Sequence, residues 1–182
     1  ELFSVPIDAS AGPVRLHQPL ASGQRILPDF QVARDGLTVG FVGDLVRAGR
    51  FELFLSAVDG SSPARLASDP VATRAVPVGD VQAFAAAGEQ VVFMADEDRD
   101  EVVELFSVPR NGSRGPVRLH APAVAGGDVS AFVVTPDQTR VLFSGDIESE
   151  GVTELFSVRV EGDSPPQRLH GPLVEGGSVR DW

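Results

Sequence analysis

Short apolar runs, separated by glycine, proline, aspartate and serine, follow one another along the whole chain. Between residues 129 and 170 these runs are Val129–Thr135, Arg140–Ser144, Glu154–Val160 and Pro166–His170. Runs of about five to seven residues between turn-forming residues are typical of β-strands. No window carries a sustained apolar stripe with a helical period, so few helices are expected. Apolar residues often stand at consecutive positions, which predicts sheets that are covered on both faces.

One pentapeptide marks these runs four times. ELFSV occupies residues 1–5, 104–108 and 154–158, and the related ELFLS occupies residues 52–56, so that its glutamate recurs at steps of 51, 52 and 50 residues. RLH at residues 15–17, 118–120 and 168–170, with RLA at 65–67, keeps the same interval. Four strands in each unit of about 50 residues predict the blades of a β-propeller.

The strand count predicts an all-β chain with about three and a half blades, each of four antiparallel strands. We expect an outer half-blade over residues 1–20, full blades over residues 26–69, 81–122 and 129–171, and the start of a further blade over residues 178–182. Such an incomplete ring leaves strand edges unpaired. The chain is then a segment of a larger propeller whose remaining blades are its partners, or a homo-oligomer completes the ring.

One stretch carries a family resemblance. Residues 135–170, TPDQTRVLFSGDIESEGVTELFSVRVEGDSPPQRLH, resemble the TolB-like (WD-repeat-like) β-propeller repeat. That family typically shows a Ser/Thr-Pro-Asp-Gly turn, an acidic loop, a Glu-Leu-Tyr strand and an Arg-Leu-Thr end. Here Gln138 stands at the usual glycine, and Phe54, Phe106 and Phe156 replace the tyrosine. The resemblance implies a bacterial interaction scaffold in the periplasm or outside the cell.

Charge and composition exclude several classes of function. With 15 basic and 26 acidic residues the formal net charge is −11, which disfavours binding to nucleic acid and to anionic lipid. The absence of cysteine removes disulfides, thiolate zinc sites and cysteine nucleophiles. No run approaches the roughly 20 apolar residues of a membrane span, so we expect no membrane insertion.

Acidic loops precede two of the four glutamates in the repeat. Each nine-residue loop places carboxylates at positions 1, 3, 5 and 9 and a valine carbonyl at position 7. This spacing resembles the D-x-D-x-D-G-x-x-D calcium loops of integrin-type propellers, and calcium prefers such oxygen ligands. The predicted ligands are Asp96, Asp98, Asp100, Val102 and Glu104 in one loop, and Asp146, Glu148, Glu150, Val152 and Glu154 in the other.

A structural interpretation of the same loops stays open. The loop of residues 44–52 keeps Asp44 and Glu52 but has Val46 and Ala48 at positions 3 and 5. The hairpin can therefore form without a complete ligand set. The alternative is that these loops are solvated acidic turns that hold no metal.

Two further sets of repeated residues are expected to be structural. The histidines stand at equivalent positions of different blades, so they cannot converge on one ion; they are His17, His120 and His170. Each repeat also pairs a glutamate with an arginine 13 or 14 residues later, which predicts cross-strand ion pairs: Glu1 with Arg15, Glu52 with Arg65, Glu104 with Arg118, and Glu154 with Arg168.

The sequence contains no nucleophile elbow, no H-E-x-x-H motif and no glycine-rich phosphate loop. We therefore expect no enzyme activity and a scaffold that binds a protein or another ligand. The alternative is an accessory propeller of a larger hydrolase of the prolyl-oligopeptidase type, or of a polysaccharide-degrading enzyme.

Overall fold

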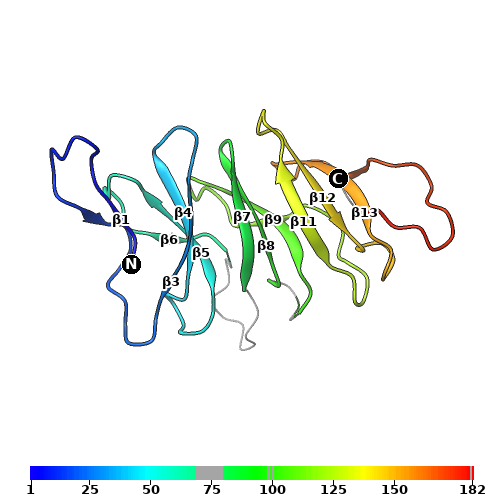
Figure 1. Cartoon of the computed structure of the whole chain (residues 1–182), viewed down its shortest axis with the longest axis horizontal. Helices are drawn as coiled ribbons and strands as arrows, with labels where there is room; N and C mark the ends of the chain where they lie inside the picture. The colour runs from blue at the N-terminus through cyan, green and yellow to red at the C-terminus, as the bar shows by residue number, and fades with distance from the viewer. Residues whose placement is uncertain (69–79, 98, 100, 181) are drawn as a thin grey trace.

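The computed structural model describes residues 1–68, 80–97, 99, 101–180 and 182. These residues form strands, turns and loops, and none of them lies in a helix. Among them there is accordingly no helix that is long and apolar enough to span a membrane. Figure 1 shows the sheets standing side by side, with β1 at one end of the row and the β11–β13 sheet toward the other.

Three four-stranded sheets and one two-stranded sheet make up the described chain, all with antiparallel neighbours in chain order. The half-blade holds β1 (Phe3–Ser4) and β2 (Val14–Arg15). The three blades are, in order, β3 (Ile26–Val32), β4 (Thr38–Gly43), β5 (Glu52–Ala57) and β6 (Arg65–Leu66); β7 (Val81–Ala87), β8 (Gln90–Ala95), β9 (Glu104–Pro109) and β10 (Val117–Arg118); β11 (Val129–Val134), β12 (Arg140–Gly145), β13 (Glu154–Arg159) and β14 (Gln167–Arg168).

The first strands of successive blades contact one another, β3 with β7 and β7 with β11. Sheets that meet along their first strands and continue outward in chain order are arranged as propeller blades. The all-β prediction is confirmed, and the described sheets are those of an incomplete propeller.

A ladder of phenylalanines crosses the first three strands of each blade. In the first blade Phe30 lies opposite Phe41, and Phe41 lies opposite Phe54. The rings on the second and third strands are stacked, with centroids 5.8, 5.5 and 5.2 Å apart in the three blades. The exposed fraction of the central rings, Phe41, Phe93 and Phe143, is 0%. Stacked, fully buried aromatic rings are large contributors to core stability.

The second and third strands are buried on both faces, as the consecutive apolar residues predict. Five of the six residues are buried in each of β4, β5 and β8, four of the six in β12, and all six in β9. The outer strands are shorter than the predicted runs: only Gln167–Arg168 of residues 166–170 pairs as a strand.

The predicted start of a further blade forms no strand among residues 178–180 and 182. It does make the first bond of a blade, because the Val179 N–H donates to the Thr153 carbonyl at 2.8 Å. Val129 makes the same bond to Val103 at the start of β11.

The predicted cross-strand ion pairs form in three of the four repeats. The nitrogen–oxygen distances are 3.4 Å for Arg15 with Glu1, 3.2 Å for Arg118 with Glu104 and 3.1 Å for Arg168 with Glu154.

The prediction for Glu52 and Arg65 is wrong. Glu52 pairs with Arg50, whose Nε lies 3.1 Å from its carboxylate. Arg65 instead donates to the backbone carbonyls of Pro109 and Arg110 in the next blade.

The contact between two neighbouring blades, which we call the seam, explains why Arg65 bonds to the next blade. At two seams a serine of the third strand donates to a carbonyl of the following blade: Ser4 to Val58, and Ser107 to Val160. At the seam between the first two full blades Leu55 replaces the serine and Arg110 stands at the equivalent carbonyl. Arg65 therefore supplies the donor that Leu55 lacks.

Candidate functional site

The acidic loops join the second and third strands of each blade and lie beside the segments that enter the next blade. Position 1 of every loop is an aspartate whose carboxylate accepts two backbone N–H groups. Asp146 accepts from Asp128 at 2.7 Å and from Gly151 at 2.9 Å. Burial alone would raise the pKa of Asp146, but these two N–H donors outweigh it and lower the pKa. The carboxylate is thus held ionised by the backbone.

The other two loops repeat this arrangement. Asp44 accepts from the N–H groups of Arg25 and Gly49, and Asp96 accepts from those of Asp80 and Glu101. The donor at position 6 has a left-handed backbone in all three loops, with φ of 84°, 58° and 74° at Gly49, Glu101 and Gly151. A positive φ turns this N–H back toward position 1, which is why glycine is favoured there.

A second acidic residue continues the chain of bonds into the next blade. Asp128, which precedes β11, accepts the Val103 N–H of the preceding loop at 2.7 Å, and Val129 donates back to the Val103 carbonyl at 2.8 Å. Because the Asp128 N–H also donates to Asp146, one residue ties two loops together. We call this set of bonds the inter-blade latch.

The latch recurs at the other two places where a blade follows a loop. Asp80 accepts from the Phe51 N–H at 2.8 Å, and Ser178 accepts from the Thr153 N–H at 2.8 Å. The residues that accept at this position, Asp80, Asp128 and Ser178, were not predicted as site residues. Their signal in the sequence is a glycine, then Asp or Ser, then valine, at residues 79–81, 127–129 and 177–179.

Several of the remaining acids of the described loops pair with arginines. Glu104 is fully buried, and its carboxylate accepts from Arg118 and from the Ala123 N–H. In the last loop Glu148 and Glu154 both pair with Arg168. Glu150 is exposed and lies over Gly126.

These contacts bear on the calcium prediction. In the loop of residues 146–154, position 1 is bound by amides and positions 3 and 9 share Arg168, so a calcium ion would have to displace that arginine. Asp98 and Asp100 lie outside the described residues, and calcium in the loop of residues 96–104 stays a prediction. Val102 and Val152 each donate an N–H within their own turn, to Arg99 and Ser149. Within the described residues no three acids or histidines are grouped as metal ligands.

Two buried histidine rings accept hydrogen bonds from backbone N–H groups of the third strands. The Nε2 of His120 accepts the Leu105 N–H at 3.1 Å while its Nδ1 lies 2.6 Å from the Ala121 carbonyl. His17 makes the same two contacts with Leu2 and Gln18. Where the repeat has Ala67 instead, the Ser68 hydroxyl accepts the equivalent N–H, from Leu53. Burial lowers the pKa of His120, which keeps the ring neutral and Nε2 free to accept.

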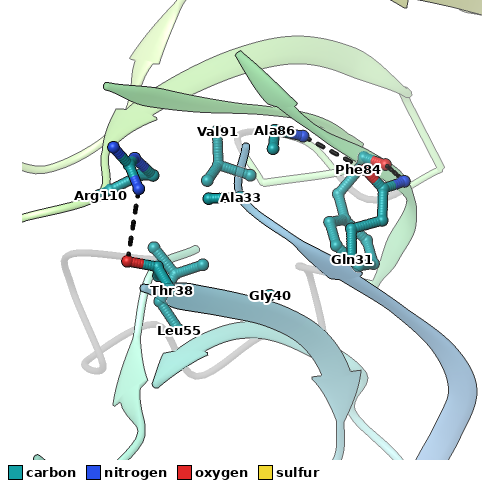
Figure 2. Close-up of a pocket in the computed structure, with 9 residues that line it drawn as sticks. All are labelled: Gln31, Ala33, Thr38, Gly40, Leu55, Phe84, Ala86, Val91 and Arg110. Atoms are coloured by element: carbon teal, nitrogen blue, oxygen red, sulfur yellow. Dashed lines mark hydrogen bonds between the residues drawn. The ribbon is translucent and has the colours of Figure 1, made fainter. Parts of the chain in front are cut away.

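The seam between the first two full blades encloses a cavity of about 10 Å³, room for roughly one water. Figure 2 shows Gln31 reaching across it, with its Nε2 donating to the Phe84 carbonyl at 2.8 Å and its Oε1 accepting from the Ala86 N–H. Arg110 closes the other end by pairing with Asp35 at 2.7 Å. The cavity is a packing feature of the seam.

A larger hollow of about 210 Å³ opens beside β3 and β7, the first strands of two blades. Asp29 and Gln82 supply its polar edge, and Leu27 and Val81 are among the apolar residues below. It is too small for most organic ligands, whose pockets usually exceed about 300 Å³.

No family model matches the chain, and no curated protein matches it. Solved structures do. A puromycin-hydrolyzing peptidase of Mycobacterium tuberculosis has a TM-score of 0.55 at 16% identity, over 91% of this chain and 26% of that one. A puromycin hydrolase mutant complexed with PGG has a TM-score of 0.53 at 13% identity, over 79% and 22%. An oligogalacturonate lyase in complex with manganese has a TM-score of 0.53 at 9% identity, over 90% and 46%.

At these identities the likeness shows a shared fold. The chain spans about a quarter of the length of the two puromycin-hydrolyzing enzymes and just under half of the lyase. The structural class is therefore that of β-propeller blades, as the repeat predicts.

We expect Asp128→Ala to destabilise the chain by about 1–3 kcal/mol, because it leaves the Val103 N–H without its acceptor. Asp128→Asn keeps an acceptor oxygen and should cost clearly less. Urea denaturation followed by circular dichroism measures both. Asp163→Ala, which removes an exposed ion pair with Arg159, is the control and should change stability by less than about 1 kcal/mol. Equal, small effects of all three substitutions would contradict the latch.

Stability should fall as the pH drops below 6.5, the ordinary pKa of histidine. The pKa of folded His120 lies lower, so the unfolded chain binds the proton first and is favoured until the pH reaches the folded pKa. The loss is about 1.4 kcal/mol for each unit by which folding lowers the pKa. His120→Gln, which keeps an acceptor, should flatten the pH dependence measured by thermal denaturation between pH 5 and 8 (roughly the range of histidine titration).

The matched control is His170→Gln, since among the described residues no N–H donates to the Nε2 of His170, which lies 3.8 Å from a Glu154 carboxylate oxygen instead. If His120→Gln leaves the pH dependence unchanged, protonation of His120 does not contribute to the loss of stability.

Proposed function

We propose that the chain is a non-catalytic segment of a β-propeller that serves as an interaction scaffold. One observation carries the proposal: the repeated polar side chains of the described blades are engaged in holding their own blade or the next one. Glu104 and His120 bond within a blade, and Asp128 bonds between two. A propeller enzyme needs unlike residues that converge on one point, whereas these recur at equivalent positions of successive blades.

A more specific proposal is an accessory propeller attached to a catalytic domain. The fold likeness to a puromycin-hydrolyzing peptidase and to an oligogalacturonate lyase supports it, since the chain spans only part of each enzyme. The TolB-like pattern of residues 135–170 supports an extracytoplasmic bacterial scaffold. Its partners are then a protein ligand, the remaining blades of the ring, or further copies of the chain.

An activity screen tests the proposal. We expect the chain to show no turnover of aminoacyl-amide or peptide substrates, and none of oligogalacturonate. Turnover that a single substitution of an exposed acid such as Asp29 abolishes would contradict it. The coding sequence on either side of residues 1–182 discriminates the two forms of the proposal, because an adjoining hydrolase or lyase domain supports the accessory role.

Calcium in the loop of residues 96–104 is a further part of the proposal, supported by its D-x-D-x-D spacing. Isothermal titration should then give saturable heat with millimolar calcium (about the affinity of extracellular calcium modules), and Asp96→Asn should abolish it. Asp44→Asn, in the loop that lacks two of the acids, is the control and should leave the heat unchanged. Absence of heat from the unsubstituted chain would remove calcium from the proposal.

A further inference from the structure

The hollow of about 210 Å³ beside β3 and β7 lies between the first two full blades, and we call it the first-strand hollow. Leu27, Asp29, Gln31 and Val42 line it from one blade, and residues 81–84 line it from the next. All eight strands of these two blades, β3 to β10, are described. Both walls of the hollow are therefore complete.

An irregular pairing at the start of β3 shapes this hollow. Three residues, 27–29, stand opposite Val42 of the second strand. The first strands of the other two blades have two residues at the same place, 82–83 and 130–131. A β-bulge re-aims a side chain and is frequent beside functional sites. Among the three described blades, the extra residue belongs to the first alone.

The enlarged bulge carries a carboxylate at the edge of the hollow. Counted back from the phenylalanine of each first strand, Asp29 stands where the other blades have Ala83 and Ala131. Asp29 is exposed, and among the described residues no hydrogen bond or ion pair engages its carboxylate. The repeated acids Asp44 and Glu104, in contrast, are held by backbone N–H groups or by arginine. The carboxylate of Asp29 is free to bind a ligand.

The other groups of the hollow suit the aliphatic part of a cation. Leu27 packs against the core that the first two full blades share, which includes Val42 and Val81. The amide of Gln31 is fixed by its two bonds to the next blade. Gln82 is exposed at the polar edge and offers a side-chain carbonyl. An apolar floor below a carboxylate and an amide matches a side chain with an aliphatic stem and a charged end.

We propose that the first-strand hollow binds the side chain of a lysine that a partner protein presents, with the ammonium group on Asp29. The net charge of −11 attracts a cationic partner. An ammonium group has three rotatable donors and can reach acceptors on two different strands, Asp29 on β3 and Gln82 on β7, whereas a guanidinium needs acceptors in its plane.

The size of the hollow indicates that the ammonium arrives on a larger molecule. Pockets for free organic ligands usually exceed about 300 Å³, so this hollow has room for a single side chain. The inference rests on the scaffold role proposed above and names the chemistry of its partner. Turnover in the activity screen would overturn the scaffold role, whereas a lysine peptide that does not bind overturns the lysine site alone.

The test is a titration of the chain with the peptide acetyl-Gly-Lys-Gly-amide, followed by nitrogen–proton correlation NMR. We expect saturable shifts at the side-chain amide of Gln82 and the backbone amide of Ala83. The same peptide with an acetylated lysine should bind at least roughly 5-fold more weakly, because it loses a charge-assisted hydrogen bond. Asp29→Asn should weaken binding of the lysine peptide to a similar extent.

The matched control is Glu175→Gln, which removes the same charge from an exposed acid outside the hollow. It should bind the peptide like the unsubstituted chain, and thermal denaturation checks that both variants are folded. No saturation up to about 10 mM (tenfold weaker than a millimolar complex), or equal losses in the two variants, would overturn the proposal. So would tighter binding of the matching arginine peptide or of n-butylamine, because the occupant would then be a guanidinium or a free amine.

Discussion

The arrangement of the blades depends on the pair of hydrogen bonds at the inter-blade latch, one to a carboxylate and one between backbone groups. A four-stranded sheet that is apolar on both faces is not stable alone and must be covered by its neighbours. The bonds between Val103 and the start of β11 fix where the next sheet begins, and the Asp128 carboxylate fixes its direction. Once the first strand is held, the buried phenylalanine ladder can pack in register against the preceding blade. Polar bonds thus position the blades, and apolar burial stabilises them.

The geometry of the latch also explains why the sequences of these loops resemble metal-binding loops. A calcium loop and a latched hairpin both need an acid at position 1 and a tight turn with a left-handed residue at position 6. In the loops of residues 44–52 and 146–154 the amide of that residue donates to one oxygen of the carboxylate at position 1. The spacing of the acids predicts the shape of the turn. The partner of each carboxylate depends on which groups the fold places next to it.

The repeat was sufficient to predict the all-β class, the four-strand unit and the burial of both sheet faces, because these follow from local apolar runs and their interval. Three ion pairs were predictable for the same reason, since Glu104 and Arg118 stand on adjacent strands. The latch was not, because its donors are backbone N–H groups. Phe51, Val103 and Thr153 all fill that position, so no residue type marks it. The change of partner at Arg65 was not predictable from the repeat, because Arg65 bonds to a neighbouring blade in place of the serine that Leu55 replaces.

Leu55 and Arg110, which stand where other repeats have serine and valine, make one seam chemically different from the other two. Two seams match a serine to a carbonyl, and the third needs an arginine from the outer strand and an ion pair between Arg110 and Asp35. The first two full blades therefore meet through polar contacts that the other two seams do not have. A chain built from repeats is prone to pairing its units in the wrong order while it folds. A seam with its own polar contacts disfavours such mispairing, and the residues that create it, Leu55 and Arg110, are ones that depart from the repeat.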